Sequence, residues 1–159
     1  MTMVRQFRFF LLLMAVGGAI AAPCGGPLHA QDRGFGLGIM VGSPTGLSGK
    51  LWVSQQNAVD VGLAWSFSHE GYMHIHGDYL WHFPHAIRSS ERFVLYAGIG
   101  GRVGLSDDAR IGVRIPGGIG WWPRNVPLDV FLEIAPVLDL APETDFDMTG
   151  ALGARYFFD

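Results

Sequence analysis

Histidine and aspartate alternate with other residues in the segment 74–78, His-Ile-His-Gly-Asp. Alternate side chains of a β-strand point to one face, so His74, His76 and Asp78 would share a face at a spacing of about 7 Å. Imidazole and carboxylate groups are ligands that zinc uses. Spacing alone is a weak sign of a metal site, so we expect the two histidines to be hydrogen-bonded to Asp78 and other acids. Metal binding by His74, His76 and Asp78 is the alternative, and no cofactor is predicted.

A second set of charged residues recurs at alternate positions of segments that are otherwise apolar or glycine-rich. Its members are Lys50, Asp60, Asp78, Arg102, Arg114, Glu133 and Arg155. A charge removed from water is strongly destabilising unless it is paired, so we expect these side chains to form ion pairs with one another. We place Glu133 between Arg114 and Arg155. Such a network would block the interior enclosed by the strands. The alternative is that these residues line a small path for ions.

Residues that could serve a nucleophilic reaction occur in segment 66–70, where Ser66, Ser68, His69 and Glu70 lie close in sequence. They fall on alternating faces of a strand and in a turn, and they match no catalytic motif. A catalytic triad is defined by its geometry rather than by its composition. We therefore predict that the protein is not an enzyme.

Segments of period-two hydrophobicity alternate with short turns rich in Pro, Gly, Asn, Asp and Ser, which is typical of an antiparallel meander. We predict eight strands, at residues 34–42, 46–53, 58–67, 72–83, 92–105, 110–122, 128–139 and 146–158. An even number of strands brings both ends of the meander to the same side.

The two faces of these strands differ in composition. The apolar face runs from Phe35 in the first strand to Leu138 in the seventh and carries no charge, whereas the polar face combines charged residues with glycines. An eight-strand barrel has an interior just wide enough for side chains, which the apolar face would overfill. We therefore predict an all-β fold, an eight-stranded antiparallel up-and-down transmembrane β-barrel with short turns and a polar plugged lumen.

Aromatic residues of the apolar face gather at strand ends, as expected for girdles at the two membrane interfaces. The predicted girdles consist of Phe35, Trp65, Phe67, Trp81, Phe83, Phe93, Trp121, Tyr156 and Phe158. Only Trp65 and Phe67 belong to the end remote from the termini.

The N-terminal segment has the order of a secretory signal. Arg5 and Arg8 precede an uncharged apolar run over 9–22, and Ala30 ends a segment suited to cleavage. We predict a cleaved signal peptide over 1–30 and an outer-membrane β-barrel domain over 31–159. Cys24, the only cysteine, raises the alternative of a lipoprotein, but Pro23 and the missing leucine at position 21 argue against it.

Four segments carry a resemblance to a known class of proteins: residues 42–50, 76–83, 96–102 and 127–142. With them the chain resembles the small OmpA/OmpX-type eight-stranded outer-membrane barrels, and more closely a bacterial family of short barrel proteins of unknown function. The resemblance covers essentially the whole chain after residue 30. It implies a bacterial outer-membrane location, lipid as a partner and recognition of the C-terminal strand by the barrel-assembly machinery. Asp159, which follows Phe158, departs from the aromatic ending usual in such barrels.

Composition and turn length restrict the function. With 11 basic and 14 acidic residues the net charge is −3, and nothing indicates nucleic-acid binding. We expect an integral outer-membrane protein with a structural or membrane-organising role. The alternatives are a surface binding module (an adhesin or host-factor binder), a lipid-modifying enzyme and a small pore. The short turns at 43–45, 68–71, 106–109 and 141–145 offer little surface for a specific partner.

Overall fold

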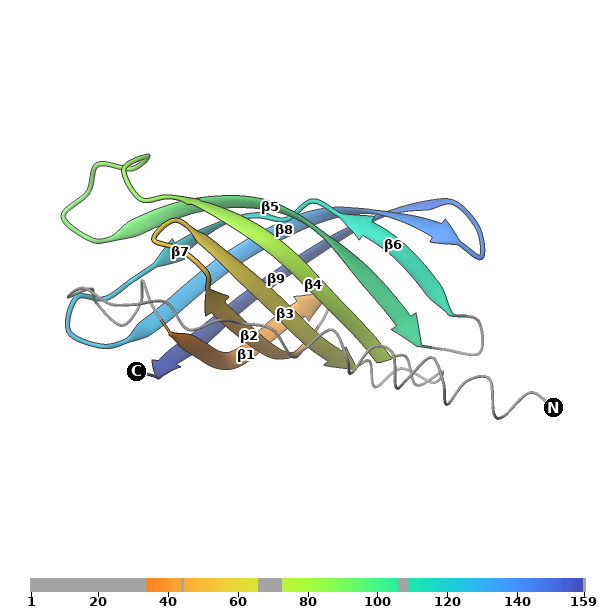
Figure 1. Ribbon diagram of the computed structural model, residues 1–159, viewed down its shortest axis with the longest axis horizontal. Coiled ribbons are helices and arrows are strands. Elements are labelled where there is room, and N and C mark those ends of the chain that lie inside the picture. The colour runs from red at the N-terminus through yellow and green to blue at the C-terminus, as the bar shows by residue number, and fades with distance from the viewer. Residues whose placement is uncertain (1–33, 44, 66–72, 106–108, 159) are drawn as a thin grey trace.

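The computed structural model describes residues 34–43, 45–65, 73–105 and 109–158. In these residues the fold is all-β, and antiparallel strands form one sheet that closes on itself by pairing its first strand with its last (Figure 1). The strands are β1 (Phe35–Ser43), β2 (Gly46–Trp52), β3 (Asn57–Trp65), β4 (Met73–Phe83), β5 (Phe93–Leu105), β6 (Arg110–Arg114), β7 (Gly117–Trp121), β8 (Leu128–Ala141) and β9 (Asp145–Phe158). Since β6 and β7 both lie between β5 and β8, the ring has eight strand positions.

The predicted strand over 110–122 is divided into two, β6 and β7, which is the main difference from the expected set of strands. Ile115 and Pro116 separate β6 from β7, because proline has no N–H to donate to a strand ladder. Backbone hydrogen bonds still cross the interruption: the Gly98 N–H donates to the Pro116 carbonyl at 2.8 Å, and the Ile115 N–H to that of Pro136 at 3.0 Å. Arg114 and Pro116 are both buried, so the alternation of faces continues through the break.

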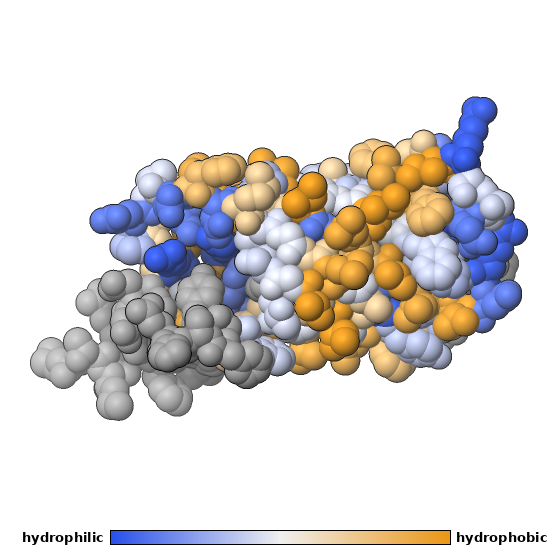
Figure 2. All heavy atoms as spheres, turned by 180° about the vertical axis from the view of Figure 1, so that it is seen from behind, coloured by the Kyte–Doolittle hydropathy of each residue, from blue (hydrophilic) through white to orange (hydrophobic). Residues whose placement is uncertain are grey.

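The outer face of the ring is apolar and exposed. Leu132 and Ile134 of β8 are 55% and 61% exposed, and the predicted apolar face as a whole points outward. Figure 2 shows hydrophobic side chains over the middle of the flank, with hydrophilic side chains gathered at the two ends. No helix in the described part of the chain is long and apolar enough to cross a membrane.

Glycines on the inner face lie opposite the largest inner side chains. Gly62 pairs with His76 between β3 and β4, and Gly100 pairs with Asp78 between β4 and β5. A Cβ on Gly62 would lie 2.1 Å from His76 Cε1, and one on Gly100 would lie 2.0 Å from Asp78 Oδ1. The glycines of the polar face therefore make room for the charged and aromatic side chains of the neighbouring strand.

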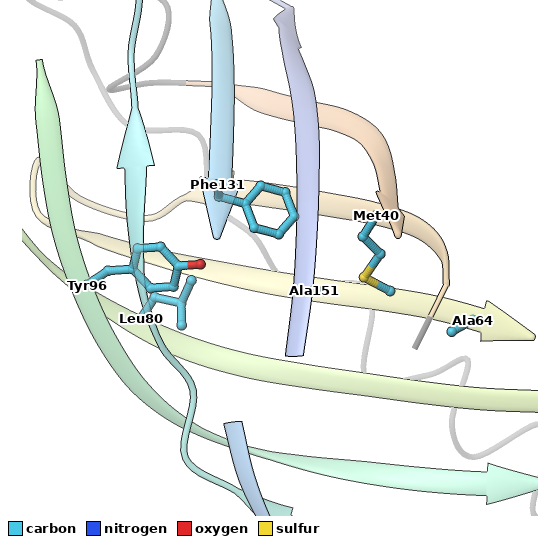
Figure 3. Close-up of a cluster of buried hydrophobic side chains, with 6 residues drawn as sticks. All are labelled: Met40, Ala64, Leu80, Tyr96, Phe131 and Ala151. Atoms are coloured by element: carbon cyan, nitrogen blue, oxygen red, sulfur yellow. The ribbon is translucent and has the colours of Figure 1, made fainter. Parts of the chain in front are cut away.

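Two apolar clusters fill part of the interior. The first joins Met40, Ala64, Leu80, Tyr96, Phe131 and Ala151, which point inward from six strands (Figure 3). The second lies where the C-terminal strand ends and contains Trp52, Ala58, Val94, Trp122 and Phe157. There the Trp52 ring lies 5.6 Å from that of Trp122 and 4.4 Å from that of His82. The predicted signal peptide over 1–30 and the girdle residue Phe67 lie outside the described residues.

Candidate functional site

Arg155 is the centre of a buried ion network that joins opposite walls of the ring. It lies on β9, where it is 1% exposed, and its guanidinium donates to Asp60 of β3, to Asp129 Oδ2 of β8 at 3.2 Å and to Ser48 Oγ of β2 at 2.8 Å. Its guanidinium carbon also lies 3.8 Å from the centre of the Phe131 ring. One side chain thus ties together three strands other than its own.

Asp129 is shared by several donors, although its part in the network was not predicted. Lys50 Nζ lies 3.2 Å from Asp129 Oδ2, and Trp122 Nε1 donates to Oδ1 at 3.1 Å. The Lys50 ammonium also lies 4.8 Å from the centre of the Trp52 ring. The period-two alternation of β8 puts Asp129 on the same face as Glu133, so the sequence could have predicted that Asp129 belongs to the network.

Arg114 forms the other half of the network. Its Nη2 donates to Glu133 Oε1 at 2.5 Å, and its Nε lies 3.2 Å from Asp78 Oδ2. The Tyr96 hydroxyl donates to Glu133 Oε2 at 3.0 Å. We call Lys50, Asp60, Asp78, Arg114, Asp129, Glu133 and Arg155 the central network.

The predicted position of Glu133 between Arg114 and Arg155 is wrong on one side. In the register of β8 against β9, Arg155 lies directly opposite Asp129, whereas Glu133 lies opposite Ala151. Arg155 therefore forms its ion pairs with Asp129 and Asp60. Of these two arginines, only Arg114 forms an ion pair with Glu133. The sequence does not give the strand register, so it could not show which of the two would pair with Glu133.

Arg102 belongs to a second group, near the end of the ring remote from the C-terminus. Its Nε and Nη2 donate to the two carboxylate oxygens of Asp139 at 2.9 and 2.7 Å, which is a bidentate pair. Its Nη1 donates to Asp147 Oδ2 at 3.0 Å, and the Asp147 side chain is 49% exposed. This end of the interior is therefore closed by ion pairs that border solvent.

The predicted metal residues are only partly brought together. His74 Nε2 lies 3.2 Å from His76 Nδ1, so the two histidines contact each other. The group able to hold a metal ion is instead Asp60, His76 and Asp78, whose ligand atoms lie within 4.8 Å of one another. Asp60 replaces His74 because it lies directly opposite Asp78 in the pairing of β3 with β4.

A small cavity borders the central network. A cavity of about 10 Å³ is lined by His76, Arg114 and Glu133, together with residues of β1 and β9. That volume accommodates about one water molecule.

The predicted girdle residues lie on the outer face wherever the structure describes them. Phe35, Trp65, Trp81, Phe83, Trp121, Tyr156 and Phe158 are exposed, and Phe93 is half-buried. Neighbouring rings contact each other, as in Tyr79 with Trp81 at 5.0 Å and Tyr156 with Phe158 at 5.2 Å. Ser66, Ser68, His69 and Glu70, the residues weighed for nucleophilic chemistry, lie outside the described residues.

Comparison with known protein families, with curated proteins and with solved structures yields no match for this chain. The resemblance to OmpA/OmpX-type barrels therefore stays a prediction from the sequence. A function has to be inferred from the two faces of the ring.

Proposed function

We propose that this chain is an integral β-barrel of the bacterial outer membrane, of the small OmpA/OmpX type, with a structural or membrane-organising role. The observation that carries the proposal is the composition of the two faces: apolar side chains cover the outside of the strands, while the charged side chains of the central network, Arg102 and Asp139 are buried inside. Soluble monomers rarely expose contiguous apolar patches larger than a few hundred Å². Lipid is the solvent that matches such an outer face.

Closure of the sheet supports the same proposal. Hydrocarbon offers backbone groups no hydrogen-bond partner, so a membrane-spanning sheet must have no free edge. The pairing of β1 with β9 over Phe35–Ser43 removes the edge that an open sheet would expose. The exposed aromatic residues at the strand ends then lie where headgroups meet hydrocarbon.

The charged side chains that cross the interior favour a structural role over transport. Arg102 and Arg114 extend across the space that an ion would need, and both are held by carboxylates on other strands. An eight-strand barrel leaves little room beside such side chains. The outer-membrane location rests on the predicted signal peptide and on the aromatic C-terminal strand.

The five tryptophans allow a direct test, because adjacent residues Trp121 and Trp122 lie on opposite faces. In two variants, each retaining one of these tryptophans and carrying Phe at the other four positions, fluorescence is measured in vesicles with brominated acyl chains. Trp121, which is 38% exposed, should be strongly quenched, and Trp122, which is 3% exposed, should not. Equal quenching of the two, or quenching of neither, would contradict a lipid-facing outer surface.

A cellular experiment tests the location separately. After expression of the full chain, the protein should fractionate with outer membranes and migrate differently on a gel before and after boiling, because a closed barrel resists detergent until heated. A soluble protein whose migration ignores boiling would overturn the proposal.

A further inference from the structure

Asp78 is a buried carboxylate that has an ion pair but no hydrogen bond. Its side chain is wholly buried, and neither oxygen accepts a hydrogen bond from any described residue. Arg114 Nε is 3.2 Å from Asp78 Oδ2 but makes no hydrogen bond there. Buried polar groups are nearly always hydrogen-bonded, so a carboxylate that has only this ion pair can accept a further ligand, such as a water molecule or a metal ion.

The small cavity does not provide that partner. Arg114 and His76 line it, so a water molecule there can serve the Arg114 guanidinium. Asp78 is not among its lining residues. The possible ligand groups nearest to Asp78 are Asp60 and His76, with ligand atoms within 4.8 Å.

His76 is oriented as metal-binding histidines are. Its Nδ1 is engaged with His74 Nε2 at 3.2 Å, while its Nε2 is directed toward Asp60 Oδ1 at 3.9 Å. With His76 Nδ1 as the donor, the lone pair of Nε2 faces the carboxylates. Metal-ligating histidines almost always donate their second ring N–H to another group in this way.

Asp60 is arranged to share its two oxygens between a cation and a ligand. Its Oδ2 accepts from Arg155, which leaves Oδ1 on the side of His76. Ligands bound tetrahedrally to Zn²⁺ at about 2.1 Å lie about 3.4 Å apart. Asp60 Oδ1 and His76 Nε2 are 3.9 Å apart, and all three ligand atoms lie within 4.8 Å of one another, so small side-chain movements would bring them to that spacing.

The charge of the central network also favours a cation. When all of its groups are ionised, its four carboxylates (Asp60, Asp78, Asp129 and Glu133) exceed its three cations (Lys50, Arg114 and Arg155) by one charge. We propose that Asp60, His76 and Asp78 bind one divalent first-row metal ion, such as Zn²⁺, inside the ring. This site depends on the closed interior and not on what surrounds the outer face.

The test uses the full chain without a histidine tag, purified in folded form from whichever fraction contains it. Titration with Zn²⁺, and with Co²⁺ followed by its visible absorption, should show one ion per chain. His76→Gln and Asp78→Asn should abolish the Co²⁺ band. His74→Ala should weaken binding about 10–100-fold, because it removes the group that orients His76.

Two matched controls separate the site from other acidic and imidazole groups. His82→Gln changes another buried histidine of β4, and Asp139→Asn changes the carboxylate held by Arg102; both should bind the ion as the unaltered chain does. Circular dichroism verifies that each variant retains its strands. Absence of stoichiometric binding, or binding that persists in folded His76→Gln and Asp78→Asn, would overturn the proposal.

Discussion

Adjacent residues of β8 lie in opposite surroundings. Leu132 is 55% exposed on the outer face, whereas its neighbours Phe131 and Glu133 are 2% and 7% exposed inside. Glu133 has its partners within the chain, since Arg114 and Tyr96 both donate to it. The Leu132 side chain, in contrast, is left largely uncovered by the rest of the described chain.

The two faces differ in whether their side chains find interaction partners within the chain. The inner face combines ion pairs, hydrogen bonds and aromatic contacts, so that it stabilises the ring from within. The outer face contributes to stability only when an apolar environment covers it, because the hydrophobic effect scales with the apolar area removed from water. Interior variants should therefore act in any detergent or lipid, and outer variants should act through the lipid.

Removal of Arg155 should have the largest effect. Arg155→Gln leaves Asp60 and Asp129 buried without their shared counter-charge, which should lower the free energy of unfolding by about 3–5 kcal/mol. Urea unfolding in lipid vesicles measures the loss. Adding Asp60→Asn should recover part of it, because the two residues share one network. A loss below about 1 kcal/mol, which corresponds to about a fivefold change in the unfolding equilibrium constant, would contradict a central role for Arg155.

An arginine on the outer face should be the next most costly change. Leu132→Arg at mid-strand should destabilise the protein folded in bilayers by about 2–4 kcal/mol. The variant Phe131→Arg, one residue away, serves as the comparison, since its added charge would lie inside beside Arg155. The cost of Leu132→Arg should shrink in short-chain detergent, and that of Phe131→Arg should persist. Unimpaired folding of Leu132→Arg in bilayers would argue against a lipid-facing surface.

A smaller effect is expected where the aromatic cluster meets the central network. Trp122→Phe removes the Nε1 donor to Asp129, and a hydrogen bond to a charged group contributes about 1.5–3 kcal/mol. Trp121→Phe is the matched control, because its Nε1 donates to Glu91 at the exposed rim. Urea unfolding should rank the Trp122 variant well below the Trp121 variant in stability. The reverse order would mean that the two faces are assigned the wrong way round.

Coupling between charges should distinguish the two arginines near Glu133. In a double-mutant cycle, Glu133→Gln with Arg114→Gln should show a coupling energy of about 0.5–3 kcal/mol, because the residues contact each other. The cycle of Glu133→Gln with Arg155→Gln should show a smaller coupling. Equal couplings would indicate that the register of β8 against β9 differs from that described.

The smallest signal is expected from conductance. In planar bilayers the unaltered protein should give no stable large channel, only rare small openings, because Arg102 and Arg114 fill the interior. Trimming both arginines to Ala should increase the frequency and size of the openings. Steady, large channels in the unaltered protein would replace the structural role with passive transport.

Period-two alternation was sufficient to predict the strands and the sorting of residues between faces. Within the described residues, the observed strand bounds differ from the expected ones by at most two residues, apart from the strand that Pro116 divides; the expected ends at 67 and 72 lie outside them. The partners inside the ring could not be predicted, because they depend on register and on reach across the interior. Asp60 lies beside His76 because of the register of β3 against β4, and Asp129 rather than Glu133 pairs with Arg155 because of the register of β8 against β9. The pair of Arg155 with Asp60 joins strands far apart in sequence.

The pairing of β1 with β9 has a consequence for the order of folding. Phe35 pairs with Phe158, so the contact that closes the ring joins the two extremes of the described chain. A contact of such high sequence separation forms slowly, and no partial chain can complete it. Until β9 is present, β1 keeps an unpaired edge beside a large apolar face, a state prone to association with other chains. The newly made chain must therefore be kept apart from its copies until its last strand is available.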